Sequence, residues 1–291
     1  MLPATNLFDN LPYSTVRIIA DTHDGGEKFG TAFCFAFRSI WSAQGQHPPL
    51  ELLITNNHVV QGTQSGRMCF HDARDIARGG VAGTRSFTIE LDDFENRWTP
   101  HPNPEIDLCA MPLAPLVGDA DRDGHELYCV ALEDILIPSG QFLLDLCAIE
   151  DVTMIGYPIG LWDHVNNMPI VRRGITATHP RMDFQGNPVF VIDAACFPGS
   201  SGSPVLIADR GSYVNRENTL VVGPSGRTLL LGILHAGPKM NARGRIETVP
   251  IPTSTNADPA ELVMHLGYVI RSSALRDFFA VFVNKPRSGP G

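Results

Sequence analysis

Three short segments of the sequence carry side chains that together could perform acyl transfer. The turn PGSSGSP (residues 198–204) places Ser201 among glycines between two apolar runs, where backbone N–H groups can lie beside its hydroxyl. The segment ITNNHVV supplies His58, and the segment EIDLC supplies Asp107. Serine is a poor nucleophile until a base takes its proton, and histidine suits that role near neutral pH. We therefore predict Ser201 as nucleophile, His58 as base and Asp107 as the carboxylate that orients the base.

Each of these residues also has a purely structural interpretation. A Ser/Gly/Pro loop can simply close a hairpin, and a histidine after an apolar run can be a satisfied core residue. Asp92 and Asp93 compete with Asp107, but they lie in an acidic run typical of a solvated turn. Asp107 precedes the apolar segment LCAM, where a carboxylate needs a hydrogen-bonding partner. The coincidence of the three segments favours the catalytic interpretation.

The composition indicates a globular protein and argues against some partners. The 291 residues are 43% hydrophobic and 18% charged, which allows a buried core in one large or two modest domains. The formal net charge of -9 argues against nucleic acid and anionic membranes as partners, because both favour lysine and arginine. The apolar stretches are too short to span a bilayer, and the N-terminus has no secretory pattern.

The cysteines and one acidic run bear on cofactors and location. Six cysteines are scattered along the chain, at positions 34, 69, 109, 129, 147 and 196, with no CxxC pair. We expect free thiols, no metal or cofactor, and a cytoplasmic location, although a mature secreted protein that had lost its leader would have a similar N-terminus. The run DADRDG (residues 119–124) imitates the start of a calcium loop. Val130 stands where that loop needs glutamate, which favours a charged surface loop instead.

Short apolar runs separated by turn signals predict an all-β protein. The predicted strands cover residues 30–37, 52–55, 86–91, 107–112, 142–149, 152–156, 170–178, 189–195, 205–208, 229–234 and 266–270. Two helices are predicted near the end, at 258–264 and 273–282, each opened by a capping residue. The mixed stretch 118–141 is the predicted link between two β domains.

The three segments resemble those of trypsin/chymotrypsin-like serine peptidases, in the bacterial branch that includes the HtrA proteases. ITNNHVV is similar to the HtrA histidine segment, Asp107 with the leucine after it to the aspartate strand, and GSSGSP to the motif G-x-S-G-x-P. The resemblance covers about residues 13–284, and their order, His58, Asp107, Ser201, matches the family. The chain stops soon after its predicted terminal helix, so we expect no PDZ domain of the kind that HtrA proteins carry.

The resemblance implies an all-β fold of two six-stranded antiparallel β-barrels, with the active site in the cleft between them. Residues 13–134 would form the first barrel and carry the histidine and the aspartate. Residues 135–284 would form the second barrel with the serine and a C-terminal helix, and residues 1–12 and 285–291 would be tails.

The resemblance also implies a serine endopeptidase that cleaves polypeptides through an acyl-enzyme, with the backbone N–H groups of Gly199 and Ser201 as oxyanion hole. The implied substrate-binding residues are Ala195, Cys196, His235, Ala236 and Gly237. No carboxylate suited to lysine or arginine lies among them, which predicts cleavage after small or medium apolar residues. A His235 side chain inside the pocket would favour acidic or amide residues instead, whereas one packed beneath the triad would not.

Two other functions and one form of control fit the same sequence. A catalytically silent trypsin fold could act as a binding module, and the same acyl chemistry could serve an esterase. Ser200 stands where zymogens carry an aspartate that pairs with a new N-terminus, and no IVGG site is present, so activation by trimming is not expected. An unformed oxyanion hole or a cleft that depends on a regulatory partner would then restrain the enzyme.

Overall fold

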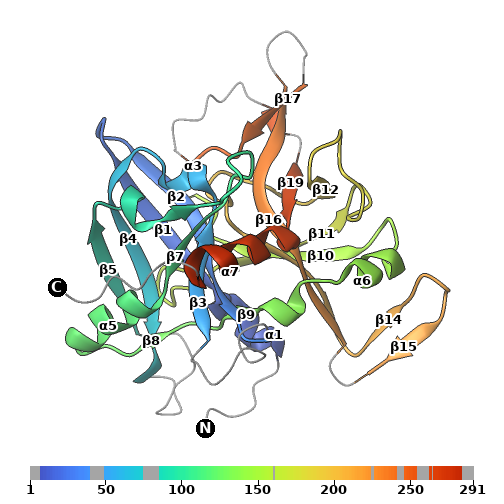
Figure 1. Ribbon diagram of the computed structural model, residues 1–291, viewed down its shortest axis with the longest axis horizontal. Coiled ribbons are helices and arrows are strands. Elements are labelled where there is room, and N and C mark those ends of the chain that lie inside the picture. Colours follow the sequence, from blue (N-terminus) through green and yellow to red (C-terminus); the bar gives the residue numbers. More distant parts are fainter. Residues whose placement is uncertain are drawn as a thin grey trace.

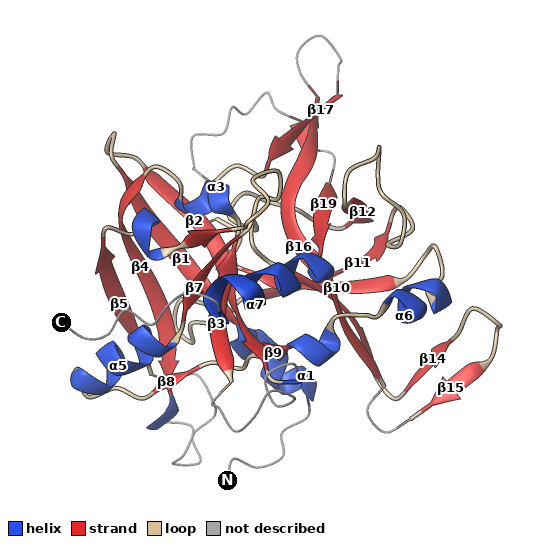
Figure 2. Ribbon diagram, in the orientation of Figure 1, coloured by secondary structure: helices blue, strands red, loops and turns tan. Residues whose placement is uncertain are grey.

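Strands in two sheets make up most of this computed structural model, which describes residues 7–39, 49–74, 85–159, 161–223, 226–240, 246–253, 262–263 and 265–283. The first sheet lies on the left in Figure 1 and the second on the right. Figure 2 shows that helices are few and short beside the strands. The all-β class predicted from the sequence is confirmed.

The first sheet is antiparallel along its main path, in the order β5-β4-β1-β2-β3-β7-β6, and two short strands pair beside that path. Its strands are β1 (Thr15–Thr22), β2 (Glu27–Phe37), β3 (Leu50–Thr55), β4 (Thr63–Asp72), β5 (Ser86–Asp92), β6 (Thr99–Pro100), β7 (Cys109–Pro112), β8 (Leu127–Tyr128) and β9 (Leu132–Glu133). β8 pairs with β4, and β9 lies parallel to β2.

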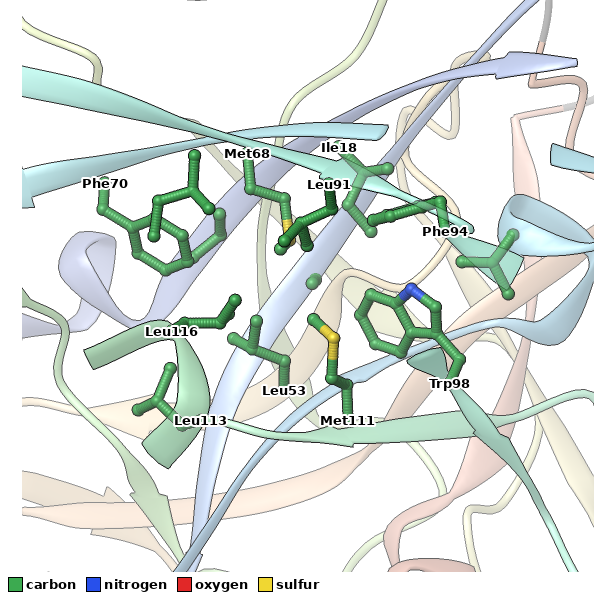
Figure 3. Packing of buried hydrophobic residues seen from close by; sticks show 14 of the residues in the cluster. Ile18, Leu53, Met68, Phe70, Leu91, Phe94, Trp98, Met111, Leu113 and Leu116 are labelled. Carbon is green, nitrogen blue, oxygen red and sulfur yellow. The ribbon is translucent and has the colours of Figure 1, made fainter. Parts of the chain in front are cut away.

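The first sheet curves around its own apolar core. Figure 3 shows side chains of β1, β4 and β5 meeting Trp98 and Met111 in this core. β2 serves two cores at once because successive strand residues point to opposite faces. Ala32 and Cys34 face this core, whereas Phe33 and Phe35 pack in a second cluster with residues of the other sheet. That second cluster fixes the two sheets against each other.

The second sheet closes into a six-strand barrel, because β13 pairs with both β10 and β16 in the order β13-β10-β11-β12-β19-β16. Its strands are β10 (Asp151–Gly156), β11 (Ile170–Thr176), β12 (Val189–Asp193), β13 (Pro204–Asp209), β16 (Arg227–Met240), β17 (Ile246–Pro250), β18 (Leu262–Val263) and β19 (Leu266–Arg271). β14 (Ser212–Val214) and β15 (Leu220–Val222) form a separate hairpin.

The C-terminal helix α7 (Arg276–Val283), which overlaps the helix predicted at 273–282, lies across the sheets in Figure 1. Phe278 is buried in the cluster shared by both sheets, so the helix fastens one to the other. The other α-helices given among the described residues are α1 (Leu7–Asn10), α3 (Asn57–Val60), α5 (Ala114–Arg122) and α6 (Gly140–Asp145). Single 3₁₀ turns cover Leu11–Ser14, Glu95–Arg97, Asp134–Leu136 and Ser272–Leu275.

Three sequence predictions need correction. The predicted strand at 142–149 is wrong, because residues 140–145 form helix α6, whose first turn is capped by the Ser139 hydroxyl accepting from the Phe142 N–H at 3.1 Å. The predicted helix at 258–264 lies mostly outside the described residues, and its residues 262–263 form strand β18. The acidic run 119–124 begins on helix α5 rather than in a surface loop.

Two further observations concern the stretch 118–141 and the cysteines. The stretch is not an open linker, since its strands β8 and β9 both join the first sheet. All six cysteines are free, as predicted. Within the described ranges, no helix is long and apolar enough to cross a membrane. The division into domains at residues 134 and 135 stays a prediction.

Candidate active site

His58 stands on the single helical turn α3, directly after the buried strand β3. Val59 and Val60 are buried in the first sheet's core and anchor this turn. Asn56 has an extended backbone, so the chain changes direction between strand and helix and presents the imidazole at the sheet's edge. The Lys28 ammonium donates to the His58 carbonyl at 3.0 Å, which holds the turn from its other side.

Asp107 precedes strand β7 and meets the histidine through both carboxylate oxygens. Its Oδ2 lies 2.5 Å from His58 Nδ1, and its Oδ1 accepts the His58 backbone N–H at 3.0 Å. The Asn56 side chain donates to the Asp107 carbonyl at 2.8 Å. The rival Asp92 is exposed at the end of β5, and Asp93 accepts from Asn96 in the following turn. Asp107 is therefore the acid that lies behind the ring.

Ser201 lies on the other side of the His58 ring from Asp107, with its Oγ 2.9 Å from His58 Nε2. The serine is fully buried in the turn before β13, and strand β2 holds that turn, with the Thr31 N–H donating to the Ser201 carbonyl at 2.9 Å. Gly199 and Gly202 have φ of +81° and +86°. A Cβ at Gly202 would lie 1.9 Å from the Thr31 carbonyl oxygen, so only glycine fits there.

Arg172 is a residue of this site that sequence reasoning missed. It reaches from β11 under the turn, where its guanidinium donates to the Ser200 hydroxyl at 2.9 Å and to the Ala195 carbonyl. Burial lowers its pKa from the ordinary arginine value, yet an arginine stays charged in a protein. It bridges both ends of the loop that carries Gly199. No local sequence signal marks this role, because β11 is distant along the chain.

His235 lies against the acid rather than the nucleophile. Its Nδ1 is 3.9 Å from Asp107 Oδ2, too long for a hydrogen bond. Burial lowers the His235 pKa to about 4; the Asp107 charge opposes this shift and His58 adds to it. It lines a cavity of about 210 Å³ together with Asp107 and Tyr268. This placement agrees with a histidine packed beneath the triad, and the preference for apolar residues stays a prediction.

The other residues predicted to bind substrate surround the serine turn and the strand beside it. Cys196 is buried, which raises the pKa of its thiol to about 12 and leaves it neutral. Ala236 and Gly237 lie on β16, where they pair with Pro250 and Val249 of β17. A larger cavity of about 780 Å³ lies elsewhere, between the N-terminal helices and the second barrel, and shares no residue with the site.

The arrangement can move a proton from a hydroxyl to an imidazole that a carboxylate keeps in one tautomer. Asp107, His58 and Ser201 lie where the two β-sheets meet, and one of these sheets is a closed six-strand barrel. The sequence matches the model of the trypsin-like peptidase domain over residues 30–214. The chain therefore belongs to the trypsin-like peptidase domain family, and the predicted resemblance is confirmed.

Solved structures that this chain resembles include proteases and an inactivated protease paralogue. The HtrA-type protease AlgW with a tripeptide is 16% identical with a TM-score of 0.46, over 94% of this chain and 61% of that one. A collagenase designated HL is 12% identical with a TM-score of 0.49, over 98% and 100%. The inactivated protease paralogue S-I1 of the scabies mite is 10% identical with a TM-score of 0.42, over 96% and 97%. No curated protein matches the sequence.

Proposed function

We propose that the chain is a serine endopeptidase in which Ser201, His58 and Asp107 act as a catalytic triad. This proposal rests on the position of His58, whose Nδ1 lies 2.5 Å from Asp107 Oδ2 and whose Nε2 lies 2.9 Å from Ser201 Oγ. The family membership supports a hydrolase that acts on peptide bonds. The substrate is a polypeptide, and no step of the chemistry needs a metal or a cofactor.

In this mechanism the Ser201 Oγ attacks the scissile carbonyl carbon while His58 Nε2 takes the hydroxyl proton. Asp107 stabilises the imidazolium that forms. The N–H groups of Gly199 and Ser201 stabilise the oxyanion of the tetrahedral intermediate. His58 then gives its proton to the leaving amine as the C–N bond breaks. In the second half of the reaction, His58 takes a proton from the water that attacks the acyl-enzyme and returns it to the Ser201 Oγ as the ester bond breaks.

The test compares the wild type with Ser201→Ala on an unfolded protein and on a simple ester. We expect new termini at internal peptide bonds, formed by the wild type and abolished by Ser201→Ala. Hydrolysis of the ester alone would contradict an endopeptidase and identify an esterase. A correctly folded wild type that turns over neither substrate faster than the Ser201→Ala variant would contradict an enzyme and favour the binding module. A cytoplasmic location stays a prediction, which fractionation of the native cells would test.

A further inference from the structure

The edge of β16 that lies beside the serine is already occupied by this same chain. β17 pairs antiparallel with β16, with Val249 opposite Gly237 and Pro250 opposite Ala236. The ladder continues past β17, because the Ile251 N–H donates to the His235 carbonyl at 3.2 Å. A peptide substrate that binds as an added strand would need the same backbone groups. Residues 246–253 therefore take the place that such a peptide would fill.

The same segment then runs directly across the candidate triad. The Ser201 Oγ lies 3.3 Å from the Ile251 carbonyl oxygen, and its single proton can face either that oxygen or His58 Nε2. The Gly199 N–H, one of the two predicted oxyanion donors, donates to the Pro252 carbonyl at 3.1 Å. Beyond the serine, the Phe29 N–H of β2 donates to the Thr253 carbonyl at 2.6 Å. Contacts on both sides of the nucleophile make this an extended occupant that spans the cleft from one sheet to the other.

The Ile251 side chain is buried, and its backbone lies beside the nucleophile. It is 4% exposed and belongs to the hydrophobic cluster that contains Ala194 and Cys196. Cys196 is a predicted wall of the specificity pocket. A branched aliphatic side chain therefore sits where the selected side chain of a substrate would bind, which agrees with the predicted apolar preference.

The pose of the segment explains why it can persist without being cut. In a reacting substrate the oxyanion donors hold the carbonyl that the serine attacks. Here the Gly199 N–H donates to the carbonyl of Pro252, one residue further on, while the Ile251 carbonyl oxygen lies 3.3 Å from the Ser201 Oγ. The Gly199 donor therefore does not hold the Ile251 carbonyl in the position for attack. Pro252 also has a fixed φ, which limits adjustment of the segment.

We propose that residues 246–253 are a built-in pseudosubstrate, which holds the protease in a restrained state and defines its substrates as extended peptides with a branched aliphatic side chain in the pocket. This proposal rests on the proposed function, because it assigns regulation to the same site. A restraint carried by the chain itself requires no trimming of the N-terminus. Activation consists of the segment leaving the β16 edge.

The test weakens the segment and measures the rate at which a fluorophosphonate probe and an aliphatic peptide substrate react. Ile251→Ala removes apolar burial, and we expect both rates to rise about 10- to 100-fold. Val152→Ala is the matched control, since Val152 is buried in the same cluster on β10, and its rates should stay within about twofold of the wild type. Ile251→Val, a smaller change, should raise both rates about two- to tenfold and serves if Ile251→Ala does not fold.

A peptide added in trans supplies the second measurement. The octapeptide IETVPIPT, the sequence of residues 246–253, should inhibit Ile251→Ala competitively, and the same peptide with aspartate in place of its second isoleucine should not. Equal rates for the wild type and both Ile251 variants, all abolished by Ser201→Ala, would overturn the pseudosubstrate while the proposed function stands. Folded variants that never react with probe or substrate would overturn the proposed function itself.

Discussion

Replacement of Asp107 by asparagine changes one atom type and tests how the imidazole is oriented. In the wild type, the Asp107 carboxylate accepts two hydrogen bonds, from the His58 backbone N–H and from His58 Nδ1. Asparagine has one accepting oxygen and one NH₂ group that only donates. The backbone N–H is always a donor, so the asparagine oxygen must face it. The NH₂ group then faces Nδ1, which must lose its proton.

The Asp107→Asn ring therefore carries its proton on Nε2, the atom that should receive the proton of Ser201 2.9 Å away. A base in the wrong tautomer reduces kcat about 10⁴-fold in triads of this kind, which corresponds to about 5 kcal/mol of transition-state stabilisation. The assay is kcat for an aliphatic peptide substrate, with circular dichroism to establish folding. Asp92→Asn, at the exposed rival acid, is the matched control and should change kcat by less than about twofold. A folded Asp107→Asn protein that keeps a tenth of the activity would refute this reasoning.

Three further predictions concern the loop, the turn and the buried imidazole. Arg172→Met should lower kcat about 10- to 100-fold through loss of donors to the loop that carries Gly199, whereas Arg173→Met at the exposed neighbour should not. Gly202→Ala should cost at least about 2 kcal/mol of unfolding free energy beyond Gly211→Ala, because Gly211 shares the positive φ without the backbone clash. The His235 pKa is about 4 against 6.5 in the unfolded chain, so the unfolded state binds more protons between these values. His235 should contribute a loss of up to about 3 kcal/mol as pH falls from 6.5 to 4, beside a loss from His71, whose pKa burial also lowers to about 4, so His235→Ser should lose less than the wild type in denaturant titrations.

Ten of the strands and the three central residues could be predicted from the sequence because each leaves a local signal, whereas β1 and β4 of the first sheet were missed. Ser201 lies among glycines whose positive φ values are fixed by the turn, and His58 follows an apolar strand directly. Apart from residues 142–149, every predicted strand overlaps an observed one. The error at 142–149 has a local cause as well, since the capping Ser139 outweighs the apolar residues that follow it.

The features that sequence reasoning missed depend on contacts between distant residues. Arg172 acts on a turn more than twenty residues further along the chain. Both faces of strand β2 are buried, in two different hydrophobic clusters, and this is evident only when the two sheets are assembled. Pairing of residues 246–250 with β16 has no periodic signature of its own, because two prolines and an isoleucine in the segment 250–252 read as a turn. The sequence therefore allowed the residues of the site to be predicted, but it did not show that residues 246–253 lie across that site.

If Ser201 is the nucleophile of this cleft, a reagent that reacts with activated serines must modify its Oγ. Wild type and Ile251→Ala would be treated with a fluorophosphonate, digested, and the adduct located by tandem mass spectrometry. We expect one phosphonyl group, on Ser201, formed faster in Ile251→Ala and lost when His58 is replaced by alanine. An adduct on another serine, or a folded protein that takes up no phosphonyl group, would contradict it.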